Sequence, residues 1–137
     1  MNRKIYNIAL SVSSLSIGGA YYLLFKNNTI LEGIVCRLVD FMPIKHHLPR
    51  ITSTYFNNHF CDFLWAFSLF CGLSAIFSPT KKCRRIIFIS VVILGIIWEL
   101  FQLYDVVGGT GDLLDVIAYI SGAFVSLLIT TKKEKKK

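Results

Sequence analysis

The segment IIFISVVILGIIWELFQLY, residues 86–104, is long and apolar enough to cross a bilayer, and it still contains a carboxylic acid, Glu99. A helix rises about 1.5 Å per residue, so a run of about 20 residues matches a hydrocarbon core about 30 Å thick. An ionisable side chain at that depth costs about 2.5–3.5 kcal/mol on insertion scales, and it persists where it pairs, binds a ligand or carries protons. The segment therefore predicts a spanning helix with a functional position inside it.

Three more apolar runs of similar length lie along the chain, at residues 5–25, 58–77 and 113–130. Apolar residues make up 54% of the 137 residues, and the mean hydropathy is +0.58. Both values are far above those of a typical soluble protein. The sequence therefore predicts an all-α, polytopic membrane protein whose four-transmembrane-helix bundle forms a single domain, 1–137.

The run at 5–25 has an alternative interpretation as a cleaved signal peptide, because it follows basic residues and contains Gly18-Gly19-Ala20. Its apolar part continues through Phe25, which favours a span.

The basic residues, which give the chain a formal charge of +7, cluster at the ends of the apolar runs rather than on one folded face. Two precede the first run, four lie within 81–85, and five lie in the tail 131–137. Cytoplasmic loops carry an excess of Lys and Arg. We therefore expect both termini and the 81–85 loop to be cytoplasmic, in a bacterial inner membrane. The pattern predicts membrane lipids as partners and no nucleic acid.

The one long connection, residues 26–57, then lies outside the membrane. Thr29 followed by Glu32 is a capping-box signature for a helix start, and Pro43 ends the apolar pattern that follows. A helix over 29–42 is too short to span. We expect it to be an amphipathic helix on the extracytoplasmic surface.

Four acids fall at the outer end of this topology. Asp62 lies near the start of the second span, Glu99 near the end of the third, and Asp112 and Asp115 at the start of the fourth. Helical spacing puts them on stripes that continue through glycines, where helices can approach closely. We therefore predict facing stripes that form a ligand-binding pocket from Asp62, Trp65, Glu99, Gln102, Asp112, Asp115 and Tyr119.

Structural roles remain open for single members of this set. Asp112 follows Gly111 and has the position of a helix N-cap. Glu99 has Arg50 as a candidate ion-pair partner.

Part of the chain resembles the VanZ-like family of small bacterial membrane proteins. The resemblance rests on Glu99-Leu-Phe-Gln102, on Gly109-Thr110-Gly111-Asp112-Leu113-Leu114-Asp115 with Gly122, and on Asp62-Phe-Leu-Trp65-Ala66. The chain departs from the family pattern at Tyr119, where the family has Asn. The resemblance implies a helical membrane bundle linked to the cell envelope and to antibiotic resistance, without a defined mechanism.

Three functions follow as hypotheses. The first is a non-catalytic pocket that binds an envelope lipid head group, a lipid-linked envelope precursor or another amphiphile, without a cofactor. The second is an enzyme acting on phosphate-linked lipids, with a divalent cation held by His59, Asp62, Glu99 and Asp115, since such ions accept carboxylate and imidazole ligands. The third is cation or proton transport through the carboxylates. Of these, the sequence favours the non-catalytic pocket.

Overall fold

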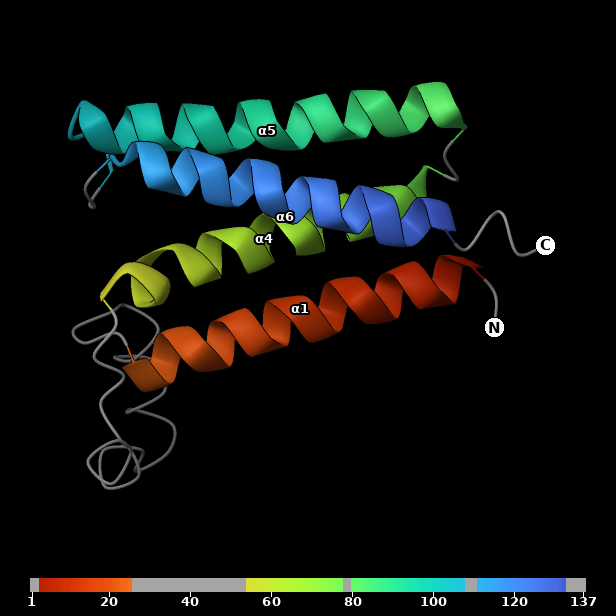
Figure 1. Cartoon of the computed structure of the whole chain (residues 1–137), viewed down its shortest axis with the longest axis horizontal. Helices are drawn as coiled ribbons and strands as arrows, with labels where there is room; N and C mark the ends of the chain where they lie inside the picture. The colour runs from red at the N-terminus through yellow and green to blue at the C-terminus, as the bar shows by residue number, and fades with distance from the viewer. Residues whose placement is uncertain (1–2, 26–53, 78–79, 108–110, 133–137) are drawn as a thin grey trace.

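A computed structural model describes residues 3–25, 54–77, 80–107 and 111–132. They form four helices: α1 (Arg3–Phe25), α4 (Thr54–Ile76), α5 (Lys81–Leu103) and α6 (Leu113–Lys132). The helices lie lengthwise beside one another and successive helices run in opposite directions, so that α1 begins at the end of the bundle where α6 ends (Figure 1). The predicted surface helix, 29–42, lies outside the described residues.

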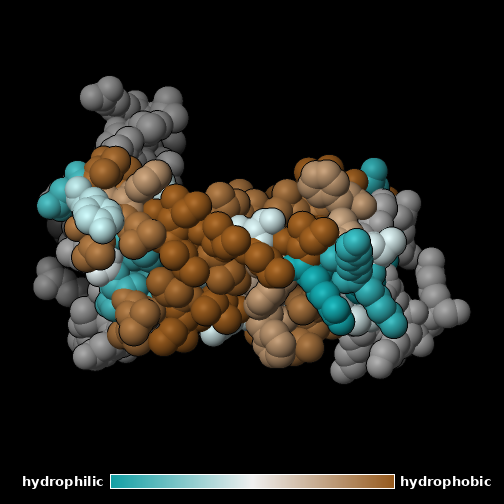
Figure 2. Space-filling view, turned by 90° about the horizontal axis from the view of Figure 1, so that it is seen from above, coloured by the Kyte–Doolittle hydropathy of each residue, from teal (hydrophilic) through white to brown (hydrophobic). Residues whose placement is uncertain are grey.

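Three of these helices contain segments that are long and apolar enough to cross a membrane. The segments are His59–Ile76, Lys81–Leu103 and Leu113–Thr131. Figure 2 shows hydrophilic surface gathered toward the two ends of the molecule, with mostly hydrophobic surface between them. The prediction of an all-helical, membrane-compatible architecture is confirmed. The fourth helix, α1, is present with 23 residues, and its role as a span stays a prediction.

Three helices begin earlier than the apolar runs indicate, α1 by two residues and α4 and α5 by four or five. Helix α4 starts at Thr54 instead of residue 58, and α5 starts at Lys81 instead of residue 86. The side-chain oxygen of Thr80 accepts a hydrogen bond from the backbone N–H of Cys83 at 3.3 Å, an N-cap that extends the helix through the basic residues. Residues 81–85 therefore form the first turns of α5, and the prediction that they are a loop is wrong. Their cytoplasmic location stays a prediction. Arg84 is buried in these turns, and its Nη1 donates to the Thr131 hydroxyl at 3.2 Å.

Helix α5 ends in a tight C-terminal turn. The backbone N–H of Val106 donates to the carbonyl of Phe101 at 2.8 Å, and that of Asp105 donates to the carbonyl of Gln102 at 3.1 Å. This pair of bonds is the Schellman pattern, which needs a left-handed residue. Asp105 fills that position with φ 55°, and Asp tolerates this conformation better than most residues.

Helix α4 is central in the described bundle, because it packs against α1, α5 and α6, while α5 packs against α6. Glycines permit the close contacts that the sequence predicts. A Cβ on Gly122 would lie 2.2 Å from the Phe63 carbonyl oxygen, and one on Gly95 would lie 2.5 Å from the Tyr119 ring. Helical spacing places Gly72 on the same stripe as Asp62, but in the structure Gly72 faces the Ser11 hydroxyl of α1.

Small polar residues join α1 to α4. The Ser11 hydroxyl donates to the Ser68 carbonyl at 2.9 Å, and the Ser68 hydroxyl donates to the Ser11 carbonyl at 2.8 Å. One turn farther along, the Ser14 hydroxyl donates to the Leu64 carbonyl at 3.0 Å. Small side chains allow two backbones to approach, and their hydroxyls find partners across the interface. This contact places α1 along one side of the predicted site.

Candidate functional site

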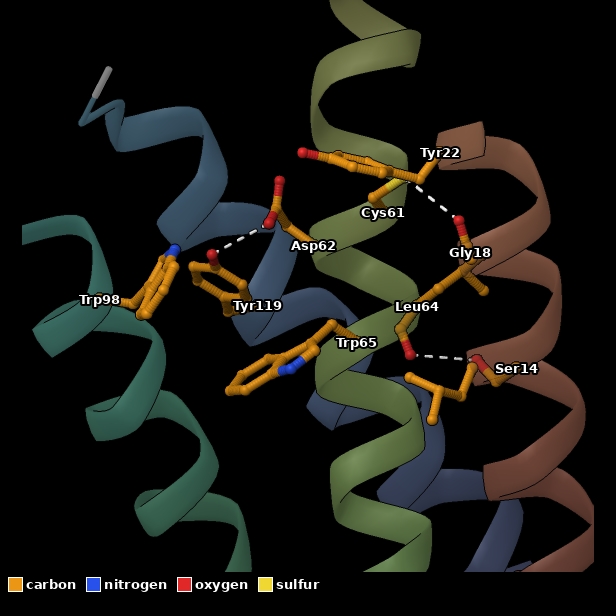
Figure 3. A pocket seen from close by; sticks show the side chains of 11 residues that line it. Ser14, Gly18, Tyr22, Cys61, Asp62, Leu64, Trp65, Trp98 and Tyr119 are labelled. Atoms are coloured by element: carbon orange, nitrogen blue, oxygen red, sulfur yellow. Dashed lines mark hydrogen bonds between the residues drawn. The ribbon is translucent and has the colours of Figure 1, made fainter. Parts of the chain in front are cut away.

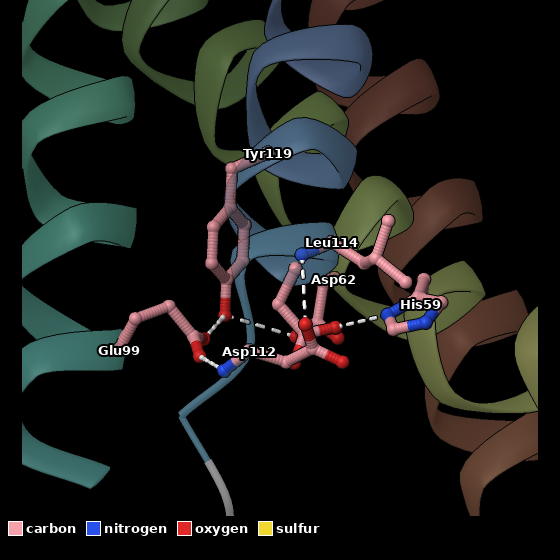
Figure 4. Close-up of polar contacts among 7 residues, drawn as sticks. His59, Asp62, Glu99, Asp112, Leu114 and Tyr119 are labelled. Atoms are coloured by element: carbon pink, nitrogen blue, oxygen red, sulfur yellow. Dashed lines mark hydrogen bonds and ion pairs between the residues drawn. The ribbon is translucent and has the colours of Figure 1, made fainter. Parts of the chain in front are cut away.

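The predicted acids meet at one end of the bundle. Asp62 comes from α4, Glu99 from α5 and Asp115 from α6. Tyr119, also on α6, points its hydroxyl between Glu99 and Asp62 (Figure 4). Glu99 is 6% exposed and Tyr119 is 3% exposed. We refer to His59, Asp62, Glu99, Asp115 and Tyr119 as the acidic cluster.

Tyr119 has two carboxyl neighbours for a single hydroxyl hydrogen. Its oxygen lies 3.0 Å from Asp62 Oδ1 and 3.0 Å from Glu99 Oε1. A phenol donates one hydrogen bond, so the second contact is made when the other carboxyl is itself protonated and donates to the phenol oxygen. Both contacts are therefore hydrogen bonds only while one of the two carboxyl groups carries a proton.

His59 completes the cluster through a short contact with Asp115. Its Nδ1 lies 2.5 Å from Asp115 Oδ1, and both side chains are largely buried, at 19% and 15% exposed. The two residues come from α4 and α6, so the contact crosses the same helix interface as the bond between Tyr119 and Asp62. The sequence predicts His59 and Asp62 as candidate ligands of one cation, and the structure pairs His59 with Asp115.

Asp112 acts as a helix cap in this structure. Its Oδ1 accepts a hydrogen bond from the backbone N–H of Leu114 at 3.0 Å, which is the N-cap geometry. Its carboxylate is exposed, while its own backbone N–H donates to Glu99 Oε2 at 3.0 Å. Asp112 does not line the cavity described below, and the role of its side chain in a ligand pocket stays a prediction. Its backbone still helps to position Glu99.

A cavity of about 330 Å³ lies beside the acidic cluster (Figure 3). Its walls come from all four helices: Ser14, Leu15, Gly18, Gly19 and Tyr22 of α1; Cys61, Asp62, Leu64 and Trp65 of α4; Trp98 of α5; and Tyr119 of α6. The volume falls near the lower end of the range of roughly 300–1,000 Å³ that is typical of ligand pockets. Asp62 and Tyr119 belong to both the cavity and the cluster.

The predicted pocket residues are thus divided between the two features. Trp65 lines the cavity and packs edge to face against Tyr119, with ring centroids 5.7 Å apart. Glu99 and Asp115 belong to the cluster and do not line the cavity. Gln102 lies one turn beyond Glu99 on α5 and is half-buried.

Sequence reasoning missed the contributions of α1 and of Trp98. The available signal in α1 was the spacing of Ser11, Ser14 and Gly18, small residues three and four apart that mark one packing face.

Within the described ranges, no three His, Cys, Asp or Glu side chains are arranged to hold one metal ion. The divalent-cation hypothesis stays a prediction.

Comparisons with protein-family models, with curated proteins and with solved structures give no match to this chain.

Proposed function

We propose that this protein is a multi-pass protein of a bacterial cytoplasmic membrane that binds an amphiphilic molecule, such as an envelope lipid, in the cavity beside the acidic cluster. The proposal places both termini in the cytoplasm and the cluster at the outer end. The VanZ-like resemblance and its link to antibiotic resistance belong to the same proposal and stay predictions.

One observation supports this function more than any other: a cavity of about 330 Å³ has an ionisable group and apolar side chains in the same wall. The ionisable group is Asp62, and the apolar surface comes from Leu15, Leu64 and the aromatic rings. Pockets of this composition fix a ligand's orientation through a few polar groups and bury its apolar part. An amphiphile has both parts.

The cavity lies where a lipid has access from the side. Helices α1 and α5 both pack on α4, but they share no substantial interface with each other among the described residues. The cavity takes residues from both, so it occupies the space between them along α4 (Figure 3). A ligand entering there would come from the bilayer rather than from water.

The same proposal includes α1 as the fourth span. Its hydroxyls donate to backbone carbonyls of α4 at Ser11 and Ser14, so these polar groups have partners that do not require water. Interhelical hydrogen bonds of this kind are common between helices in membranes. The lower hydropathy of α1 is therefore compatible with insertion beside α4.

Gly19 offers a direct test of the cavity. It lines the cavity, and a Cβ added there would meet nothing within 4 Å. A Gly19→Leu variant would fill the space, whereas Gly19→Ala would leave most of it open. Native mass spectrometry of protein purified from membranes should show bound amphiphile on the wild type and on Gly19→Ala, and loss of most of it on Gly19→Leu. Equal retention by both variants would contradict the proposal.

Transport of a cation or proton is the second candidate, and one observation favours it. Buried polar side chains continue from the cavity wall along α1, at Ser14 and Asn7. Both amide atoms of Asn7 are buried without a hydrogen-bond partner among the described residues. Flux of protons measured in proteoliposomes should fall in Asn7→Leu if this line of residues conducts. Absence of proton flux in the wild type would exclude transport and leave ligand binding as the proposed function.

A further inference from the structure

The cavity has the composition of a site for a cation. Four of its wall residues are aromatic: Tyr22, Trp65, Trp98 and Tyr119. Aromatic faces attract ammonium groups, most strongly where water is excluded, and Trp is the best of them. Asp62 adds a carboxyl to the same wall. Aromatic rings around one acid form a site suited to a single positive charge.

Charge complementarity also argues against an anionic ligand. Among the described residues that line the cavity, Asp62 is the sole acidic or basic side chain apart from the neutral Cys and Tyr groups. A phosphate or carboxylate placed there would face the acid without a Lys or Arg to neutralise it, and an unpaired buried charge is costly. An ammonium group would meet a partner that already belongs to the wall.

The acidic cluster determines what happens to the carboxyl when a cation arrives. Asp62 contacts Tyr119 of α6, and the carboxyl groups of Asp115 on α6 and Glu99 on α5 lie near it. Tyr22 of α1 and Cys61 of α4 share the cavity wall with Asp62, and His59 lies one turn before it on α4. Because Tyr119 has one hydrogen for two acids, both of its contacts are hydrogen bonds only while the array of Asp62, Tyr119 and Glu99 holds a carboxyl proton. A cation at Asp62 supplies the positive charge that this proton otherwise supplies.

We infer that the cavity binds the ammonium head group of a cationic amphiphile, and that binding releases one proton from the array of Asp62, Tyr119 and Glu99. The O–H bond of the protonated carboxyl breaks, the proton passes to water at the outer end, and the carboxylate pairs with the ammonium ion. The net charge of the site is the same before and after. This inference rests on the proposed function and specifies its ligand class.

The two tryptophans of the chain make the test direct, since both line the cavity. The full-length protein in dodecyl maltoside is titrated with dodecyltrimethylammonium while tryptophan fluorescence is recorded at several pH values. If one proton is lost for each ligand bound, the dissociation constant falls about tenfold for each unit that the pH rises, over the pH range in which the free array holds its proton. A binding constant independent of pH would overturn proton release.

Two matched variants separate the site from general electrostatics. Asp62→Asn removes the carboxyl in the cavity, and we expect at least tenfold weaker binding with no dependence on pH. Asp105→Asn removes an exposed carboxyl at the same end of the bundle, in a left-handed conformation that Asn also accepts, and should bind as the wild type does. Equally weak ligand binding in both variants would contradict the assignment of Asp62 to the binding site.

Three comparison probes identify the source of the ammonium group. They also separate the inference of an ammonium ligand from the proposed function of binding an amphiphile. Dilauroylphosphatidylethanolamine carries an ammonium group with a phosphate, dodecanoate is anionic, and octaethylene glycol monododecyl ether is neutral. Tighter binding of the phosphate-free ammonium probe indicates a cationic compound, and tighter binding of the phospholipid indicates a membrane lipid. If the neutral or anionic probe binds equally well and Asp62→Asn has no effect, this inference fails while the proposed function stands. If no probe changes the fluorescence, both fail.

Discussion

The phenol oxygen of Tyr119 lies 3.0 Å from Asp62 Oδ1, across the interface between α6 and α4. The ring of Tyr119 also covers Gly95 of α5, whose added Cβ would lie 2.5 Å from it. One side chain thus belongs to the hydrophobic core, the cavity wall and the acidic cluster at once. Changes at this residue should affect both the stability of the bundle and the site.

Removing the Tyr119 hydroxyl should weaken the bundle while keeping its packing. Tyr119→Phe retains the ring on Gly95 and loses both hydrogen bonds to carboxyl groups. We expect a lower free energy of unfolding by about 0.5–2 kcal/mol, the range reported for hydrogen bonds between membrane helices. Thermal unfolding in detergent, followed by circular dichroism, measures the change. Tyr104→Phe is the control, because Tyr104 is 74% exposed. An equal loss of unfolding free energy in that variant would show that the Tyr119 hydrogen bonds do not stabilise the bundle.

Adding one methyl group to Gly122 should separate α6 from α4. In Gly122→Ala the new Cβ would lie 2.2 Å from the Phe63 carbonyl oxygen, so the helices must move apart. We expect a loss of about 1–3 kcal/mol, typical of overpacking. Gly19→Ala makes the same chemical change into open space and should be neutral or stabilising, because Ala favours helix over Gly. Unfolding in sodium dodecyl sulfate compares the two variants, and similar curves would contradict the close contact.

His59 and Asp115 should be energetically coupled. A double-mutant cycle with His59→Gln, Asp115→Asn and the double variant isolates their interaction. Because the pair is largely buried at 19% and 15% exposed, we expect a coupling of about 0.5–3 kcal/mol, the range for two residues in direct contact. Additive changes in unfolding free energy would show that the contact contributes nothing.

The topology can be tested through the cysteines. Cys83 lies at the start of α5, at the end of the bundle opposite the acidic cluster, and is free. In a variant with Cys83 as the single cysteine, a membrane-impermeant maleimide should react in inside-out vesicles and not in intact cells. A single-cysteine Cys36 variant should show the opposite pattern, since Cys36 is predicted outside. Labelling of both from the same side would exclude the predicted orientation.

Hydrophobic run length predicted most of the helices, because burial in lipid needs an apolar segment about 20 residues long. It did not predict where the helices begin. Lys81 and Lys82 are too polar to belong to an apolar run, yet Thr80 caps the helix before them. A helix continues as long as its backbone bonds are made, whatever side chains extend into water or head groups.

The meeting of the acids was predictable for a different reason. Asp62, Glu99 and Asp115 lie at helix ends that an alternating topology brings to the same side, and helical spacing places each on a defined face. In the structure, Asp112 caps helix α6. The sequence alone leaves open whether its carboxylate caps the helix or binds a ligand. The α1 wall, including Gly19 and Tyr22, was missed because no charged residue marks that face.

The account depends most on the location of the bound amphiphile, and photo-crosslinking measures that location directly. An alkyl trimethylammonium probe with a diazirine near its head group is irradiated with the full-length protein, and modified residues are mapped by mass spectrometry. We expect adducts at cavity residues such as Gly19, Tyr22 and Trp65, lost in Gly19→Leu. Adducts confined to exposed apolar residues such as Ile89 and Ile93, with no change in Gly19→Leu, would contradict the cavity as the binding site.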